Sequence, residues 1–78
     1  MIDPRILELA DQHLTAKQRQ VWIDHHAHNM PLRAIAHYLD LSRSSVTDRY
    51  DNACRTLRRH GVRFTPDGRP YLKETHVA

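Results

Sequence analysis

Seven histidines are the residues of this sequence that most readily suggest chemistry, because imidazole binds metals and titrates near about pH 6.5. His25 and His28 share one face of a predicted helix, whereas His26 points away from that face. No cysteine or carboxylate is placed to complete a tetrahedral set of ligands, since Asp24 points elsewhere. We therefore interpret the histidines as exposed or rim residues, and we predict no metal site and no cofactor.

The potential nucleophiles form no catalytic pattern. Ser44 and Ser45 stand at no spacing from a histidine that would pair a nucleophile with a base, and no glycine-rich phosphate loop is present. The single cysteine, Cys54, cannot form an intramolecular disulfide and is interpreted as a small buried apolar residue. We predict that the protein is not an enzyme.

The length, apolar runs and charge distribution of the chain limit the class of protein to which it can belong. The chain has 78 residues, enough for one domain with a small core. No apolar run approaches the roughly 20 residues of a membrane span, and the N-terminus lacks a signal pattern, so we expect a cytoplasmic protein without a membrane partner. Residues 1–31 carry three basic and four acidic side chains, whereas residues 32–78 carry nine and five. This asymmetry favours a polyanion as the partner of the C-terminal half.

Two helices are predicted in the N-terminal half. Asp3 caps the first, which opens on Pro4 and runs to about Gln12. The second begins with a capping box at Thr15, continues to about residue 28, and ends at Asn29 in a left-handed conformation. The residues expected on the buried side of this second helix are Leu14, Val21, Trp22 and Ile23.

Two further helices are predicted around a tight turn. Pro31 opens a short helix over residues 32–39, the turn lies near residues 40–42, and Ser42 caps a long helix over residues 43–60. Gly61 ends that helix. Apolar residues expected to face the core are Ile35, Ala36 and Leu39 on the short helix, and Val46, Tyr50, Ala53 and Leu57 on the long one.

After this helical domain (residues 1–61) the pattern changes over residues 62–78. Two extended segments flank Pro66-Asp67-Gly68, a sequence typical of a turn. A short hairpin and an extended tail are both consistent with it, because an isolated hairpin is marginal in water, and residues 75–78 are expected to fray. The aromatic residues could stack on bases but are more often core in so small a domain; they are Trp22, Tyr38, Tyr50, Phe64 and Tyr71.

Two helices joined by a short turn, the second capped by serine, form a helix-turn-helix pattern. Residues 14–57 resemble region 4 of the sigma-70 family without a gap. Leu-Thr-Ala-Lys-Gln-Arg-Gln-Val at 14–21 is similar to the region's usual Leu-Pro-x-Arg-Gln-Arg-x-Val. Residues 32–42 resemble its supporting helix and turn, and Arg-Ser-Ser-Val-Thr-Asp-Arg at 43–49 resembles the start of its recognition helix. Pro31 and Asp40 replace a common serine and glycine, and both are compatible with the fold.

The resemblance implies sequence-specific recognition of duplex DNA by a small transcription regulator. In that family the first turns of the recognition helix enter the major groove, and the domain also docks on RNA polymerase. The positions that match its DNA-facing residues are Arg43, Ser44, Thr47 and Asp48, of which Arg43 could pair with guanine and Asp48 could accept from cytosine. Candidate phosphate contacts are Arg33, Arg55, Arg58, Arg59 and Arg63.

Two carboxylates favour an alternative. Asp48 and Asp51 lie on the exposed face of the recognition helix and would repel phosphate. A protein-interaction module that keeps the fold and modulates RNA polymerase, a sigma factor or another host protein would fit them, as would a homodimer. The chain has no room for the region that binds the promoter's −10 element, so we expect a small regulator of the kind that phages and mobile elements encode, not a complete sigma factor.

Overall fold

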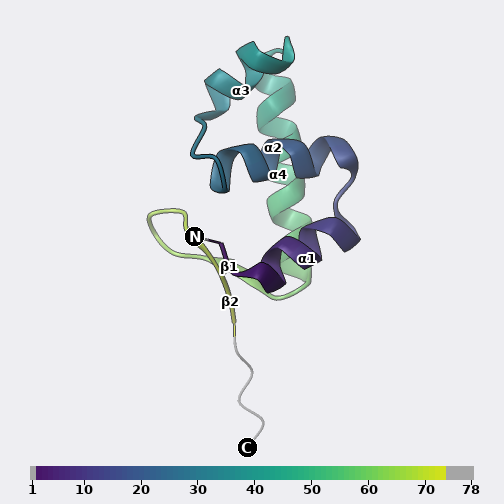
Figure 1. The fold of residues 1–78 in the computed structure, drawn as a ribbon, viewed down its shortest axis with the longest axis vertical. Helices are drawn as coiled ribbons and strands as arrows, with labels where there is room; N and C mark the ends of the chain where they lie inside the picture. The colour runs from purple at the N-terminus through teal and green to yellow at the C-terminus, as the bar shows by residue number, and fades with distance from the viewer. Residues whose placement is uncertain (1, 74–78) are drawn as a thin grey trace, which may run out of the picture.

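Within residues 2–73, which the computed structural model describes, the chain forms four helices and an antiparallel hairpin (Figure 1). The elements are α1 (Pro4–His13), α2 (Ala16–His26), α3 (Leu32–Leu39), α4 (Arg43–Arg59), β1 (Val62–Phe64) and β2 (Pro70–Leu72). The predicted all-α helix-turn-helix fold is confirmed, and the C-terminal segment is a hairpin. The expected fraying of residues 75–78 lies outside the described part of the chain.

The helices begin where local capping chemistry predicts. Thr15 and Gln18 form the capping box, because the Thr15 hydroxyl accepts from the Gln18 amide and the Gln18 side chain accepts from the Thr15 amide, each at 3.2 Å. The Asp3 carboxylate accepts from the backbone N–H of Arg5 at 2.9 Å. The Pro31 side chain makes no capping hydrogen bond, so α3 starts without one.

The end of α2 differs from the prediction, since regular helix stops at His26 and does not reach His28. The amide of His28 bonds to the carbonyl of Ile23, which interrupts the ladder of four-residue spacing. Asn29 then adopts the predicted left-handed conformation with φ 57°, and the Met30 amide bonds back to the Asp24 carbonyl at 3.0 Å. The ends of α1 and α4 lie within one residue of those predicted.

The turn between α3 and α4 depends on one left-handed residue. Asp40 has φ 54°, and the amide of the next residue, Leu41, bonds to the carbonyl of Ala36 at 2.9 Å. The chain therefore reverses in two residues before Ser42 begins the next helix. This places α3 beside the N-terminal half of α4 (Figure 1).

Two clusters of buried side chains hold the helices together. The turn-side core lies between α2, α3 and the first half of α4 and consists of Val21, Ile35, Ala36 and Val46. The α1-side core lies between α1, α2, the second half of α4 and the hairpin, and consists of Ile6, Ala10, Leu14, Trp22, Ala53, Cys54, Leu57 and Val62. Half-buried Tyr50 packs against both cores.

Most predicted core residues occupy these clusters. Trp22 and Leu57 are fully buried, and Cys54 is buried as expected for a small apolar residue. Tyr38 is an exception, because 66% of it is exposed. It follows Ile35 by three positions but precedes Leu39 by one, which places it to the side of the buried stripe of α3. The expectation that Tyr38 belongs to the core was wrong, as it was for Tyr71 on β2, which is 46% exposed.

Tertiary contacts explain why the C-terminal segment forms a hairpin. Val62 pairs with Leu72 across the two strands, and Val62 is fully buried in the α1-side core. Leu72 and Phe64 pack against the same core. A two-stranded hairpin that is marginal alone is thus stabilised by the helices. In the described residues, no helix is long and apolar enough to cross a membrane.

Candidate nucleic-acid interface

The first two turns of α4 present four polar side chains together. Arg43, Ser44, Thr47 and Asp48 are all exposed, and their spacing of one, four and five residues places them on neighbouring positions of the helix surface. The turn-side core holds this end of α4 from behind through fully buried Val46. The structure therefore brings together the side chains that the sequence singles out for base contacts.

Capping of α4 leaves three of these four side chains available, whereas the Ser44 hydroxyl lies 3.5 Å from that of Ser42. The Ser42 hydroxyl accepts from the Ser45 amide at 3.1 Å and donates to the Ser45 hydroxyl at 2.9 Å, so both serines are engaged locally. Within residues 2–73, by contrast, the side chains of Arg43, Thr47 and Asp48 form no hydrogen bond or ion pair. Unpaired polar groups on a fixed helix are free to bond with a ligand.

The start of α4 also offers backbone donors. The amides of Arg43 and Ser44 precede the first capped amide, that of Ser45, and they form no hydrogen bond with any described residue. The partial positive charge of a helix N-terminus attracts anions. A phosphate approaching this 17-residue helix would meet both N–H groups and the Arg43 guanidinium.

Acidic and basic residues alternate further along the exposed side of α4. Asp48 and Asp51 are exposed, and neither carboxylate forms an ion pair inside the described chain. The guanidinium of Arg55, one turn beyond Asp51, donates to the side chain of Asn52 at 3.3 Å. The two carboxylates are thus solvated, and the cation one turn beyond Asp51 is directed to a neutral amide.

The arginines predicted to contact phosphate differ in how freely they can move. Arg33 on α3 and Arg59 on α4 are exposed, and their side chains form no hydrogen bond or ion pair with another described residue. The guanidinium of Arg58 lies over the Phe64 ring, 5.2 Å from its centroid. Arg63 donates to the carbonyl oxygens of Arg58 at 3.0 Å and of Val62 at 3.1 Å. The first of these bonds places its positive charge against the partial negative charge of the carbonyls that end α4.

Comparison with known proteins agrees with this geometry. Residues 12–59 match the family model for sigma-70, region 4, which includes all of α2, α3 and α4. The chain belongs to the sigma-70 region 4 family. Region 4 is a DNA-binding domain of helix-turn-helix type, not an enzyme family. No curated protein and no solved structure matches the chain significantly.

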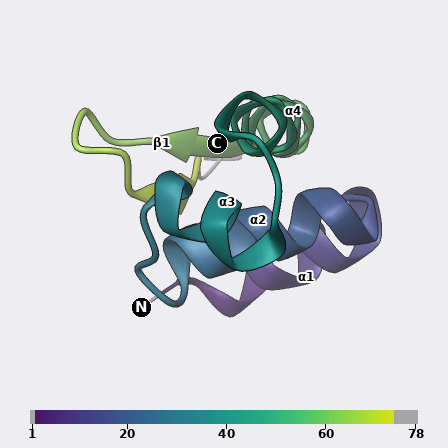
Figure 2. The ribbon, with the colours of Figure 1, turned by 90° about the horizontal axis from the view of Figure 1, so that it is seen from above.

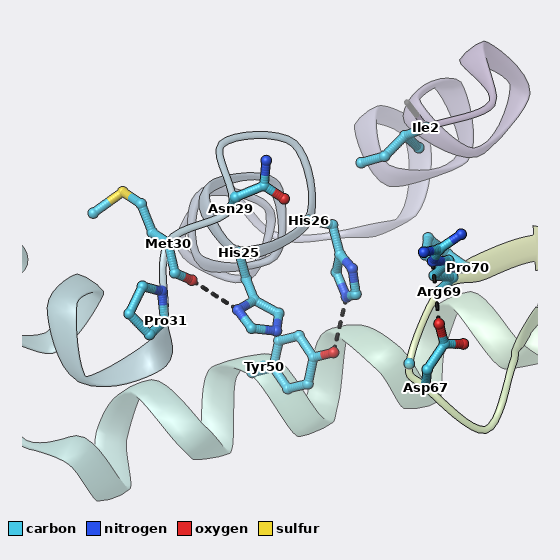
Figure 3. Close-up of a pocket in the computed structure, with 11 residues that line it drawn as sticks. Ile2, His25, His26, Asn29, Met30, Pro31, Tyr50, Asp67, Arg69 and Pro70 are labelled. Atoms are coloured by element: carbon cyan, nitrogen blue, oxygen red, sulfur yellow. Dashed lines mark hydrogen bonds and ion pairs between the residues drawn. The ribbon is translucent and has the colours of Figure 1, made fainter.

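A histidine-aromatic cluster lies between α2 and α4 of this region 4 domain (Figure 3). The Nε2 atom of His26 is 2.8 Å from the hydroxyl of Tyr50, and the two rings stack at 5.6 Å between centroids. The rings of Trp22 and Phe64 lie 4.6 and 6.0 Å from that of His26. Burial, together with the neighbouring charge of His25, lowers the pKa of His26 to about 4.

These contacts correct the interpretation of the histidines as exposed or rim residues in the case of His26. His26 is half-buried, and its partner Tyr50 is 24 positions away in the sequence, so no local pattern could have revealed it. His25 and His28 do not act as a pair. His25 Nδ1 donates to the Met30 carbonyl at 2.8 Å, and His28 lies 3.2 Å from Asp24, which was expected to point elsewhere. No described group of three or more residues could hold a metal ion.

Proposed function

We propose that this region 4 domain is a small, sequence-specific DNA-binding regulator of transcription. The start of α4 enters the major groove of duplex DNA, while α3 and the turn-side core hold it in position. The observation that carries this proposal is the exposed, unpartnered set Arg43, Thr47 and Asp48 on the capped end of α4, in a family that binds DNA through a helix-turn-helix.

Each side chain of the set has a chemical role in this proposal. Arg43 donates two hydrogen bonds to guanine, a contact worth about 1–3 kcal/mol of discrimination. Thr47 bonds to a base or phosphate and can place its methyl group against that of thymine. Ser44 bonds to a base or phosphate. Asp48 accepts from the exocyclic amine of cytosine, which turns its charge from a cost into a source of specificity.

The phosphate contacts fix the register of the helix on DNA. Arg33, Arg55 and Arg59 are exposed and can reach the backbone. Arg58 is held over Phe64, which orients its guanidinium before DNA arrives. Arg63 is bonded to carbonyls at the end of α4, so its contribution requires exchange of those bonds for phosphate.

Fluorescence anisotropy with labelled mixed-sequence duplex DNA tests this function, with the titration repeated at several salt concentrations. Phosphate contacts release counterions, so the logarithm of the association constant should fall linearly with the logarithm of salt concentration, with a slope of several units. Failure to bind near about 50 mM salt, where such contacts are strong, would contradict the proposal.

A protein-binding role is the second candidate, and Asp48, Asp51 and Tyr38 favour it. Tyr38 on α3 is 66% exposed, and tyrosine is enriched in protein interfaces. The two solvated carboxylates on α4 would repel DNA phosphates but not a protein partner. RNA polymerase is the partner that the family suggests; a sigma factor, another host protein or a second copy of the chain are further candidates. Replacing Arg43 and Thr47 by alanine should abolish specific binding if DNA is the ligand and should change little if the partner is a protein.

A further inference from the structure

The hairpin is a part of this molecule that the family match does not include, because the matched residues end at 59. It is firmly attached to the helical domain. Val62 is fully buried, Phe64 packs against the α1-side core, and the Lys73 amide bonds to the Gly61 carbonyl at 3.2 Å. An anchored hairpin directly after a recognition helix can carry a second contact at a fixed distance from the first.

The turn of the hairpin, residues 65–69, is closed by its own hydrogen bonds. The Gly68 amide bonds to the Thr65 carbonyl and the Thr65 amide to the Arg69 carbonyl, each at 2.9 Å. The Thr65 hydroxyl accepts from the Arg69 amide at 2.9 Å and donates to the Asp67 carboxylate. Gly68 has φ 90°, which glycine adopts readily. These bonds give the turn a defined shape.

This turn stands clear of the helices but reaches back toward the middle of α4. A cleft of about 800 Å³ separates it from the end of α2, with His25 and Asn29 on one side and Arg69 on the other (Figure 3). A second cleft, of about 390 Å³, lies between the turn and α4. Tyr50, near the midpoint of α4, lines both. The turn is therefore open to solvent on two sides.

Viewed along the long axis of the molecule, the hairpin projects sideways from α4 (Figure 2). In the same view α1, α2 and α3 gather on one side of α4, and no helix of the described residues covers its opposite side. The major groove is about 12 Å wide and about 8.5 Å deep, so a helix inserted in it has a phosphate backbone along each flank. An element that projects sideways from the helix lies in the path of one of these backbones.

The charges of the turn suit a phosphate. Arg69 is exposed, with 82% of its side chain in solvent, and its guanidinium lies 3.2 Å from the Asp67 carboxylate, which is itself 64% exposed. An ion pair this exposed contributes little stability, so a phosphate can replace the carboxylate as the partner of the guanidinium. On the facing wall of the smaller cleft, α4 contributes Arg55 and Arg58, together with the carboxylate of Asp51.

We propose that the hairpin turn is a second DNA contact, in which Arg69 binds the sugar-phosphate backbone that flanks α4. The backbone passes over the tip of the turn, where Gly68 borders both clefts, with Arg69 lining the larger cleft and Arg55 and Arg58 lining the smaller one. This inference rests on the proposed DNA-binding function and extends it to a segment beyond the family match. It makes the turn a sequence-independent clamp, while the start of α4 selects the sequence.

Substitutions in the turn test this contact by anisotropy, with mixed-sequence duplexes of about 24 base pairs, or somewhat more than two helical turns. Arg69→Ala should weaken binding roughly fivefold at low salt and reduce the salt slope by about 1, because one phosphate contact is lost. Asp67→Asn should strengthen binding, because it removes a negative charge and the competing partner of Arg69. The matched control is Arg19→Ala on α2, which removes the cation of another exposed pair, with Asp11, and should change the affinity by less than about twofold.

Hydroxyl-radical footprinting on a duplex selected by the wild-type protein locates the contact. Arg69→Ala should lose protection at one backbone position on one strand and keep the rest of the footprint, whereas Arg43→Ala should lose preference for the selected sequence. Unchanged salt slope and footprint for Arg69→Ala, with wild-type protein that binds DNA, would overturn the hairpin contact alone. Absence of DNA binding by the wild-type protein would overturn both proposals. Circular dichroism of each variant would verify that the helices are retained.

Discussion

The two ends of α4 are built in different ways. Its N-terminal half rests on the turn-side core of four buried residues, and its first turns expose polar side chains that have no described partner. Its C-terminal half is enclosed by α1, α2 and the hairpin around the larger α1-side core, which has eight buried residues. At this second end the ring of His26 contacts those of Trp22 and Phe64.

This contrast separates stability from recognition along a single helix. Burial of apolar surface is the main source of folding free energy, so the α1-side core should provide most of the stability of the domain. The turn-side half can then leave its polar groups unpaired for a ligand. Tyr50 packs against both cores and connects the two halves mechanically.

The largest expected effect is that of removing the central side chain of the α1-side core. Trp22→Ala should lower the free energy of unfolding by about 3–5 kcal/mol, because it leaves a cavity in the place of a fully buried ring. Chemical denaturation followed by circular dichroism measures the change. Tyr38→Ala, at the exposed aromatic residue of the turn-side half, is the control and should cost less than about 0.5 kcal/mol. Equal losses for the two variants would contradict the division of roles.

Acidification should lower the free energy of unfolding by a smaller amount, through His26 in the α1-side half of the molecule. Because burial lowers the pKa of His26 to about 4, the unfolded chain binds a proton at a higher pH than the folded chain does. This contribution to stability is fully present above about pH 6.5 and is lost as the pH falls toward 4. Since the ring is only half-buried, the loss should be about 1–2 kcal/mol, less than the full linkage value.

Denaturation of the wild-type protein and His26→Phe across that pH range isolates this effect. Phenylalanine keeps the ring contacts but cannot be protonated, so the stability of the variant should depend less steeply on pH between 6.5 and 4. Parallel profiles for the two proteins would show that His26 binds protons equally well in the folded and unfolded chains.

A smaller effect on stability is expected at the N-terminal end of α4. Ser42→Ala removes the hydroxyl that accepts from the Ser45 amide and should cost about 1 kcal/mol of unfolding free energy. Fraying of the first turn should also weaken DNA binding, because Arg43 and Ser44 lie in that turn. Ser44→Ala, which removes an exposed hydroxyl that caps nothing, should leave stability almost unchanged. A fall in stability with Ser44→Ala equal to that with Ser42→Ala would argue against capping as the cause.

The sequence predicts those features that depend on neighbouring residues. The capping box at Thr15, the left-handed Asn29 and the serine cap of α4 each require only residues within about four positions, and all are present. Four-residue periodicity likewise predicts the buried stripe of α4 that includes Val46 and Leu57. The side chains at the start of α4 follow from the same periodicity and from the resemblance to region 4.

Features that depend on tertiary contacts could not be predicted from neighbouring residues in the sequence. The hydrogen bond between His26 and Tyr50 joins two helices, and it forms only because α2 crosses α4 at that point. The choice of a hairpin over an extended tail was decided by burial of Val62 against helices that are distant in sequence. The charge of Arg63 predicts a phosphate contact, but its guanidinium lies close to the end of α4 and donates to backbone carbonyls instead.

The central claim is that the exposed start of α4 reads DNA sequence while the rest of the molecule holds it in place. Arg43→Ala tests it most directly, through affinities for a duplex selected by the wild-type protein and for mixed-sequence duplex at the same salt concentration. Loss of a bidentate guanine contact worth about 1–3 kcal/mol should reduce the ratio of the two affinities by roughly tenfold or more, with stability unchanged. A ratio equal to that of the wild-type protein would contradict the assignment of α4 as the base-reading element.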